Sequence, residues 1–123
     1  MTLNDEPPEL SAVVSDYYRF IDHGNVPAAL ACFASNAVYR RPGYDAFTGL
    51  ESIEEYYRRT RIINAGQHTI ESLIEGKDEV AVRGSLIGRS RDGLALDVRF
   101  ADFWRFRESL VVERNTYFDA AAV

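Results

Sequence analysis

The chain has 123 residues and a formal net charge of −5, with 46% hydrophobic and 27% charged residues. This length allows one domain with a sizeable core and is too short for two. The acidic balance argues against a nucleic acid or an anionic membrane as partner, since both attract basic surfaces. No apolar run approaches the roughly 20 residues of a membrane span. The acidic N-terminus lacks signal-peptide features, so we expect a cytoplasmic protein.

The first half of the chain has helical periodicity. Apolar residues between Leu10 and Ile21 recur at helical spacing, and Gly24 is a typical glycine after a helix end. A short strand over 37–40 is followed by a loop over 41–49. The sequence therefore predicts three helices, the first from residue 10 to a stop near residues 23–25, the second over 27–33 and the third over 50–61.

After Gly66 the periodicity changes to that of strands. Turn signals separate four predicted strands, over residues 67–75, 79–89, 94–107 and 110–118. Gly84 and Gly88 inside the second strand indicate bends or bulges. Helices followed by a meander predict an α+β fold, a cone-shaped barrel in which three N-terminal helices pack on a curved mixed or antiparallel sheet around an apolar pocket. We expect one domain over 9–119, with tails over 1–8 and 120–123.

One carboxylate lies on the apolar face of the third strand. Residues 94–106 alternate so that Asp102 shares a face with Phe100 and Trp104. A carboxylate buried there must be paired, hydrogen-bonded or protonated, because desolvation disfavours its charge. Two interpretations stay open. Asp102 is either a neutral proton donor with a raised pKa or one partner of a structural ion pair with an arginine.

Several local strings resemble the nuclear transport factor 2-like superfamily, which includes the ketosteroid isomerases and the SnoaL-like polyketide cyclases. The resemblance covers about residues 10–119. It rests on five segments: Tyr17–Gly24, Phe33–Pro42, Phe47–Ile53, Asp102–Phe106 and Tyr117–Asp119. These segments are specific for the fold, but one fold hosts many reactions.

The resemblance implies a site built around two residues. Ketosteroid isomerases use a helix tyrosine and a strand aspartic acid to stabilise an enolate oxygen, and these positions correspond to Tyr17 and Asp102 here. It implies a cofactor-independent isomerase, cyclase or dehydratase acting on an apolar carbonyl-bearing small molecule, such as a polyketide- or terpenoid-like metabolite. The alternative is a non-catalytic binding or dimerisation module of the same fold. If the protein is an enzyme of this type, we expect the substitution Asp102→Leu to leave the fold intact.

The chain departs from the isomerase pattern at the general base. Arg41 stands before Pro42, where the isomerases carry an aspartate, and arginine does not exchange a proton at neutral pH. Arg41 could bind an anionic or carbonyl oxygen, pair with Asp102, or point outward. Thr116 stands where limonene epoxide hydrolases carry an aspartate. His68 is the candidate replacement acid or base, with a solvated histidine as the alternative.

The remaining candidates concern the pocket wall and the outer surface. Arg114 shares a strand face with Thr116 and competes with Arg41 as the partner of Asp102. We expect the substrate to contact Arg41, Phe100, Trp104, Arg114 and Phe118, with Tyr17, Asp102 and His68 as the catalytic residues.

No metal or cofactor is expected, because the chain has no cysteine or histidine cluster at ligand spacing. Arg58, Arg59 and Arg61 suit a solvated helix end. A homodimer is expected through the outer sheet face that carries Leu73, Ile87 and Phe103.

Overall fold

The computed structural model describes residues 9–120, so the tails predicted over 1–8 and, apart from Ala120, over 120–123 lie outside the described residues. The elements in chain order are α1 (Leu10–Asp22), α2 (Val26–Leu30), β1 (Phe33–Arg40), β2 (Phe47–Thr48), α3 (Leu50–Glu55), the π-helical turn η2 (Tyr56–Thr60), β3 (Ile63–Glu75), β4 (Glu79–Ser90), β5 (Ala95–Arg107) and β6 (Leu110–Phe118).

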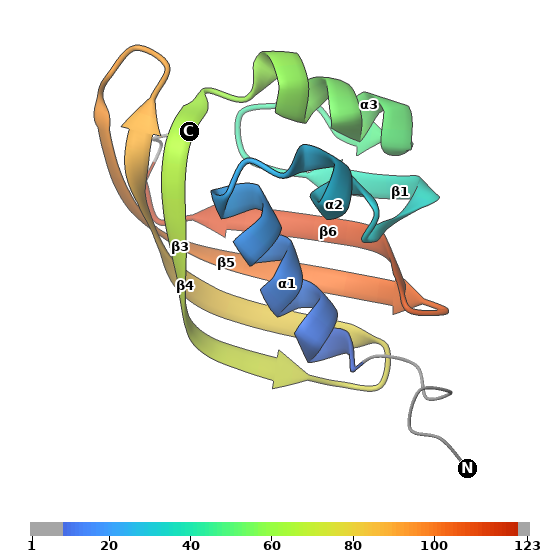
Figure 1. The fold of residues 1–123 in the computed structure, drawn as a ribbon. Coiled ribbons are helices and arrows are strands. Elements are labelled where there is room, and N and C mark those ends of the chain that lie inside the picture. Colours follow the sequence, from blue (N-terminus) through green and yellow to red (C-terminus); the bar gives the residue numbers. More distant parts are fainter. Residues whose placement is uncertain (1–8, 121–123) are drawn as a thin grey trace.

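The strands form one six-stranded mixed sheet in the order β2-β1-β6-β5-β4-β3. β1 pairs with β6 in parallel, and every other neighbouring pair is antiparallel. The helices cover one face of this curved sheet, and α1 lies across its concave side (Figure 1). The predicted α+β fold, with three helices on a mixed sheet, is confirmed. No helix among residues 9–120 is long and apolar enough to cross a membrane.

The helices present a row of aromatic side chains to the sheet. On α1, the buried residues Val14, Tyr17, Tyr18 and Ile21 recur at three- and four-residue spacing, which makes one apolar stripe. The helix predicted over 50–61 becomes a π-helical turn at Tyr56, and the consecutive Tyr56 and Tyr57 are both buried there. π-helical turns are often found at functional sites.

Two glycines allow the sheet to bend. A side chain on Gly84 would collide with the carbonyl oxygen of Thr69, and one on Gly88 with that of Ala65. The pairing of β3 with β4 shifts register twice, between Ile63 and Ala65 and between Ile70 and Ser72. The bends predicted from these glycines are therefore confirmed, and β3 curves around the end of α1 (Figure 1).

The second register shift corrects one prediction about the outer face. Because the extra residue reverses the alternation of side chains, Leu73 is partly buried against the core and Ile74 is 67% exposed. Ile87 and Phe103 do lie on the outer face, with exposures of 58% and 50%. Three early elements also differ from the prediction. The second helix ends at Leu30, β1 begins at Phe33 and not at residue 37, and β2 lies within the predicted loop.

Candidate functional site

The centre of the site is a buried ion pair between neighbouring strands. Asp102 on β5 is opposite Thr116 on β6, and Arg114 is two residues before Thr116, so Asp102 and Arg114 are diagonal neighbours. Arg114 donates from Nη2 to Oδ2 of Asp102 at 2.9 Å and from Nε to Oδ1 at 3.3 Å. The two residues are 4% and 0% exposed. The carboxylate thus has an arginine partner of the kind that buried charges require.

Other groups complete the environment of the pair. The hydroxyls of Tyr18 and Thr116 both donate to the Asp102 carboxylate. The Arg114 guanidinium carbon lies 4.5 Å from the ring centroid of Trp104, 4.7 Å from that of Tyr39 and 4.8 Å from that of Tyr17. These aromatic faces stabilise the buried cation. Asp102 therefore holds Arg114 at a fixed place in the core.

Of the two interpretations left open for Asp102, the neutral proton donor with a raised pKa is wrong. Burial by itself raises the pKa of this carboxyl, but the charge of Arg114 and the hydrogen bonds from Arg114, Thr116 and Tyr18 together outweigh burial and lower it. An ionised carboxylate only accepts hydrogen bonds. Asp102 does not fit the role of proton donor, and of the two arginines considered, Arg114 is its partner.

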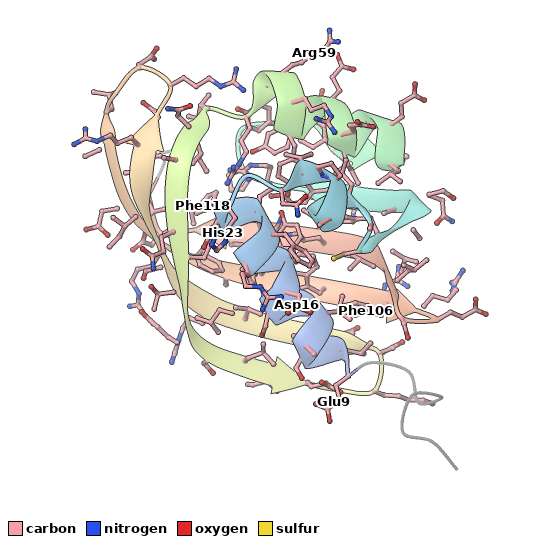
Figure 2. All side chains as sticks on the ribbon, viewed as in Figure 1. Glu9, Asp16, His23, Arg59, Phe106 and Phe118 are labelled. Carbon is pink, nitrogen blue, oxygen red and sulfur yellow. The ribbon has the colours of Figure 1, made fainter. Side chains whose placement is uncertain are left out.

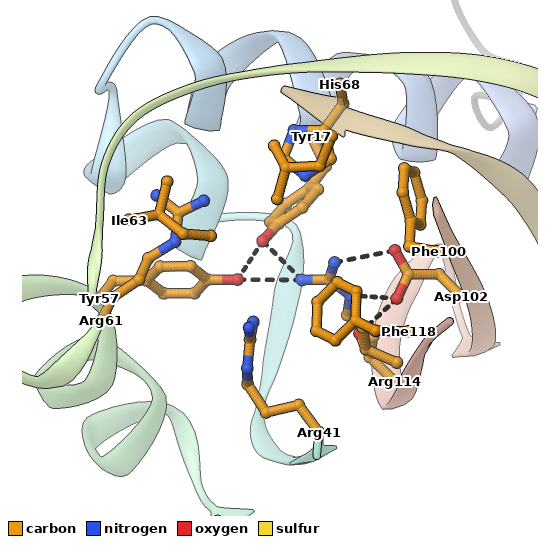
Figure 3. A pocket seen from close by; sticks show the side chains of 12 residues that line it. Tyr17, Arg41, Tyr57, Arg61, Ile63, His68, Phe100, Asp102, Arg114 and Phe118 are labelled. Atoms are coloured by element: carbon orange, nitrogen blue, oxygen red, sulfur yellow. Dashed lines mark hydrogen bonds and ion pairs between the residues drawn. The ribbon is translucent and has the colours of Figure 1, made fainter. Parts of the chain in front are cut away.

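Arg114 also organises two tyrosine hydroxyls from different helices. Its Nη1 donates to Tyr17 Oη at 2.6 Å and to Tyr57 Oη at 3.0 Å, and the two hydroxyls hydrogen-bond to each other (Figure 3). Burial raises the pKa of both tyrosines, so both hydroxyls keep their protons at neutral pH. One proton is used in the bond between them, which leaves the other free to donate to a ligand oxygen.

His68 lies near the middle of the curved strand β3 and is held by the end of α1. Its Nδ1 is 2.6 Å from Oδ1 of Asp22, and its backbone nitrogen donates to Oδ2 at 2.8 Å. The His68 side chain is 8% exposed, which excludes the alternative of a solvated histidine. In the neutral imidazole, donation from Nδ1 to Asp22 places the lone pair on Nε2. This pairing is the one that orients a histidine as a general base.

Two further arginines approach the same place. Arg41, after β1, is 8% exposed and donates from Nη1 to Tyr39 Oη at 2.8 Å. Its Nε and Nη2 have no hydrogen-bond partner among the described residues, and neither does Nε of Arg61. Figure 3 shows the Arg41 guanidinium directed toward the hydrogen bonds between Tyr57 and Arg114.

These groups enclose a small cavity between the helices and the sheet. Its free volume is about 10 Å³, roughly the space that one water molecule occupies. The lining residues are Tyr17, Arg41, Tyr57, Arg61, Ile63, His68, Leu86, Phe100, Asp102, Arg114, Thr116 and Phe118. A larger open groove of about 580 Å³ runs between α1 and β3, and Tyr18, Asp22 and His68 form part of its wall. His68 thus borders both spaces.

The structure brings together most of the residues selected from the sequence. Tyr17, Arg41, His68, Phe100, Asp102, Arg114 and Phe118 all line the cavity. Trp104 does not. It lies under α1, where it donates from Nε1 to Tyr18 Oη at 3.2 Å and packs against Tyr17 and Phe33.

Four polar residues of the site were not selected from the sequence: Tyr18, Asp22, Tyr57 and Arg61. The spacing of Ile53, Tyr56 and Tyr57 was a usable signal for Tyr57, because it is that of a buried helix stripe. Arg61 was expected at a solvated helix end, whereas its Nε is buried in the cavity wall. No local pattern connects Asp22 with His68, since 46 residues separate them.

Among the described residues, no three His, Cys, Asp or Glu side chains are grouped as metal ligands.

The fold is shared with several crystal structures. An NTF2-like protein from Burkholderia pseudomallei superposes with a TM-score of 0.82 at 19% identity, over 89% of this chain and 90% of that chain. A protein from Shewanella denitrificans assigned to the SnoaL-like polyketide cyclases has a TM-score of 0.79 at 11% identity, over 89% and 90%. TerC, co-crystallised with polyporic acid, has a TM-score of 0.78 at 18% identity, over 89% and 91%. At these identities the likeness defines the NTF2-like fold alone.

A family model described as SnoaL-like domain matches residues 14–114, and the chain belongs to this family. The resemblance predicted from the sequence is therefore confirmed. A comparison with curated proteins gave no match.

Proposed function

We propose that the protein is a cofactor-independent enzyme that moves a proton at a carbon next to a carbonyl group. The observation that carries this proposal is the Asp22–His68 pair on the wall of a cavity that also holds two protonated tyrosine hydroxyls and a fixed arginine. A base and a group that stabilises a developing oxyanion are the two parts that enolate chemistry needs.

The proposed step uses each part once. His68 Nε2 takes a proton from the carbon beside the carbonyl, the electron pair of that C–H bond forms the C=C bond of the enolate, and the π pair of the C=O bond moves onto the carbonyl oxygen. The enolate oxygen accepts a hydrogen bond from the free hydroxyl proton of Tyr17 or Tyr57, and the nearby charge of Arg114 stabilises it. The imidazolium then returns the proton to another carbon in an isomerisation, or to a departing hydroxyl in a dehydration. In a cyclisation, the enolate carbon attacks a second carbonyl carbon, the π pair of that C=O bond moves onto its oxygen, and the imidazolium protonates the resulting alkoxide.

The roles differ from those implied by the family resemblance. Asp102 is a positioning residue in this scheme, because it acts only through Arg114. His68 replaces the base that is absent at Arg41, and Phe100 and Phe118 provide the apolar part of the wall. The SnoaL-like family includes polyketide cyclases, which supports a carbonyl-bearing substrate. The co-crystallisation of TerC with polyporic acid also supports a small organic ligand for a chain of this fold.

The size of the cavity sets a condition on the proposal. A space of about 10 Å³ admits no substrate without movement of its walls. Arg61 is suited to this movement, because its side chain is long and only partly buried and it also borders a separate space of about 200 Å³ next to α1. We therefore expect the substrate to enter past Arg61.

Deuterium exchange tests the proposal without knowledge of the natural substrate. Small ketones such as cyclohexanone and acetophenone are incubated with the protein in D₂O, and loss of their α-proton signals is followed by proton NMR. We expect the wild type to catalyse exchange and His68→Gln to lower the rate by roughly a hundredfold or more.

His23→Gln is the matched control for this experiment. His23 follows α1, is exposed and contacts the backbone oxygen of Arg19, so its removal leaves the cavity unchanged. Exchange at the same rate in His68→Gln and His23→Gln would refute the assignment of the base. Absence of exchange in the wild type would favour the non-catalytic binding module.

A further inference from the structure

The cavity holds more positive charge than its own acidic residues can balance. Three arginines line it, Arg41, Arg61 and Arg114, and Asp102 is the one carboxylate in the lining. Both carboxylate oxygens of Asp102 are already bound to Arg114. Arg41 and Arg61 therefore have no acidic partner in the wall, in a protein whose net charge is −5.

Arg41 is the more informative of the two. Arg41 is 8% exposed. Of its three guanidinium nitrogens, Nη1 donates a hydrogen bond to the hydroxyl of Tyr39. Nε and Nη2 are buried and have no hydrogen-bond partner within residues 9–120. These two nitrogens form one side of the guanidinium fork, the side that binds both oxygens of a carboxylate in a bidentate pair.

Aromatic contacts do not replace the missing partner. The Arg41 guanidinium carbon lies 5.1 Å from the ring centroid of Tyr56, 5.3 Å from that of Phe118 and 5.8 Å from that of Tyr39. Ring faces stabilise the positive charge but accept no conventional hydrogen bond from the two free N–H groups. A buried guanidinium with unsatisfied N–H donors lowers the free energy of unfolding. Most buried polar groups have hydrogen-bond partners, so unsatisfied donors in a cavity wall indicate a ligand that supplies the acceptors.

We propose that the ligand of this cavity carries a carboxylate, bound by the free side of the Arg41 fork with Arg61 as a second cation. This inference rests on the proposed function and specifies its substrate class: a small carbonyl compound that is also a carboxylic acid. The carboxylate is held at the Arg41 side of the cavity, while the reacting carbon faces His68 and the carbonyl oxygen faces the hydroxyls of Tyr17 and Tyr57.

Matched pairs of ligands test this inference directly. Benzoate and benzamide have nearly the same shape and differ in charge, and acetate with acetamide gives a smaller pair for a narrow cavity. Binding is measured by isothermal titration calorimetry and by chemical-shift perturbation in ¹⁵N-labelled protein. We expect at least one carboxylate to bind roughly tenfold or more tighter than its amide, as is typical for a charge-assisted bidentate pair.

Arg41→Met removes the fork and keeps the length of the side chain. We expect it to abolish the preference for the carboxylate, and Arg61→Met to reduce it. Arg59→Met is the control, because Arg59 is exposed on the outer surface of the π-helical turn (Figure 2) and the variant changes the net charge equally. Arg41→Gln is measured in parallel, so that the comparison does not depend on the folding of one variant.

Several results would overturn the inference. These are equal affinity of the wild type for a carboxylate and its amide, no binding of either pair, or a preference that persists in both Arg41→Met and Arg41→Gln. The outcome is separable from that of the proposed function. Carboxylate preference without ketone exchange leaves an acid-binding module, whereas ketone exchange without carboxylate preference leaves an enzyme for neutral carbonyl compounds.

Discussion

The ion pair between Asp102 and Arg114 gives the sharpest prediction about stability. We expect Asp102→Asn to destabilise the protein strongly, because it leaves the Arg114 guanidinium buried without a charged partner. From the sequence we expected Asp102→Leu to leave the fold intact. That expectation assumed an unpaired carboxyl, whereas the carboxylate of Asp102 is paired with Arg114.

The magnitude follows from the contacts. The substitution removes the charge from two hydrogen bonds of 2.9 and 3.3 Å between residues that are 0% and 4% exposed. Charge-assisted hydrogen bonds contribute about 1.5–3 kcal/mol each, which gives about 3–6 kcal/mol. Removal of one partner of a buried pair typically costs about 3–5 kcal/mol. The loss is a large part of the roughly 5–15 kcal/mol that stabilises a domain.

Urea denaturation, followed by circular dichroism and by the fluorescence of Trp104, measures this loss. The double variant Asp102→Leu/Arg114→Met removes both charges and is the control. It should recover most of the lost free energy of unfolding, because apolar replacement of a whole buried pair is often neutral. A loss below about 1 kcal/mol in Asp102→Asn would refute the reasoning, since it would mean that Arg114 is not confined by the carboxylate.

Three other predictions concern the pair, the sheet and the surface. Because the folded-state pKa of Asp102 is lowered, the contribution of Asp102 to the free energy of unfolding is fully present above about pH 4 and is lost as the pH falls through the folded-state pKa. Urea midpoints measured between pH 6 and pH 2 should therefore fall more steeply for wild type than for the variant Asp102→Leu/Arg114→Met. Parallel curves for the two proteins would contradict this prediction. Gly88→Ala should cost about 1–3 kcal/mol of unfolding free energy, because its new methyl group collides with the carbonyl oxygen of Ala65. Gly76→Ala should be tolerated, because a methyl group there has ordinary contact distances. Equal unfolding midpoints for the two variants would contradict this prediction. We also expect a homodimer that forms through the outer sheet face. Light scattering should show a dimer at micromolar concentration for the wild type and a monomer for Phe103→Glu. A monomeric wild type would contradict this prediction.

Much of the fold could be predicted from the sequence because local patterns and global structure agree. The stripe on α1 and the alternation of β5 each reflect burial of one face, which is a property of short segments. The register shift in β3 is different. It depends on the close approach of Gly84 and Gly88 to the opposite strand, so periodicity alone assigned Leu73 to the wrong face.

The site was less predictable because its pairs are distant in sequence. Alternation identified Asp102 as an unusual carboxylate, but whether it was protonated or paired depended on Arg114 in the next strand. The Asp22–His68 contact depends on how β3 curves around the end of α1, and the contact between the hydroxyls of Tyr17 and Tyr57 joins residues that are 40 positions apart. These are tertiary effects, and they determine which groups can act chemically.

The proposed function requires that the cavity stabilise an anionic oxygen next to His68. Titration with 4-nitrophenol tests it most directly, because the ionised phenol resembles an enolate and its absorption spectrum reports its ionisation state. At a pH just below the pKa of the free phenol, we predict that wild type and His68→Gln bind it as the phenolate. Because either hydroxyl can donate to the ligand once the other is removed, the test uses the double variant Tyr17→Phe/Tyr57→Phe, which should weaken binding roughly tenfold or more and shift the bound spectrum toward the neutral phenol. Equal binding by wild type and the double variant, or a bound phenol that stays neutral in the wild type, would contradict the stabilisation of an anionic oxygen by these hydroxyls.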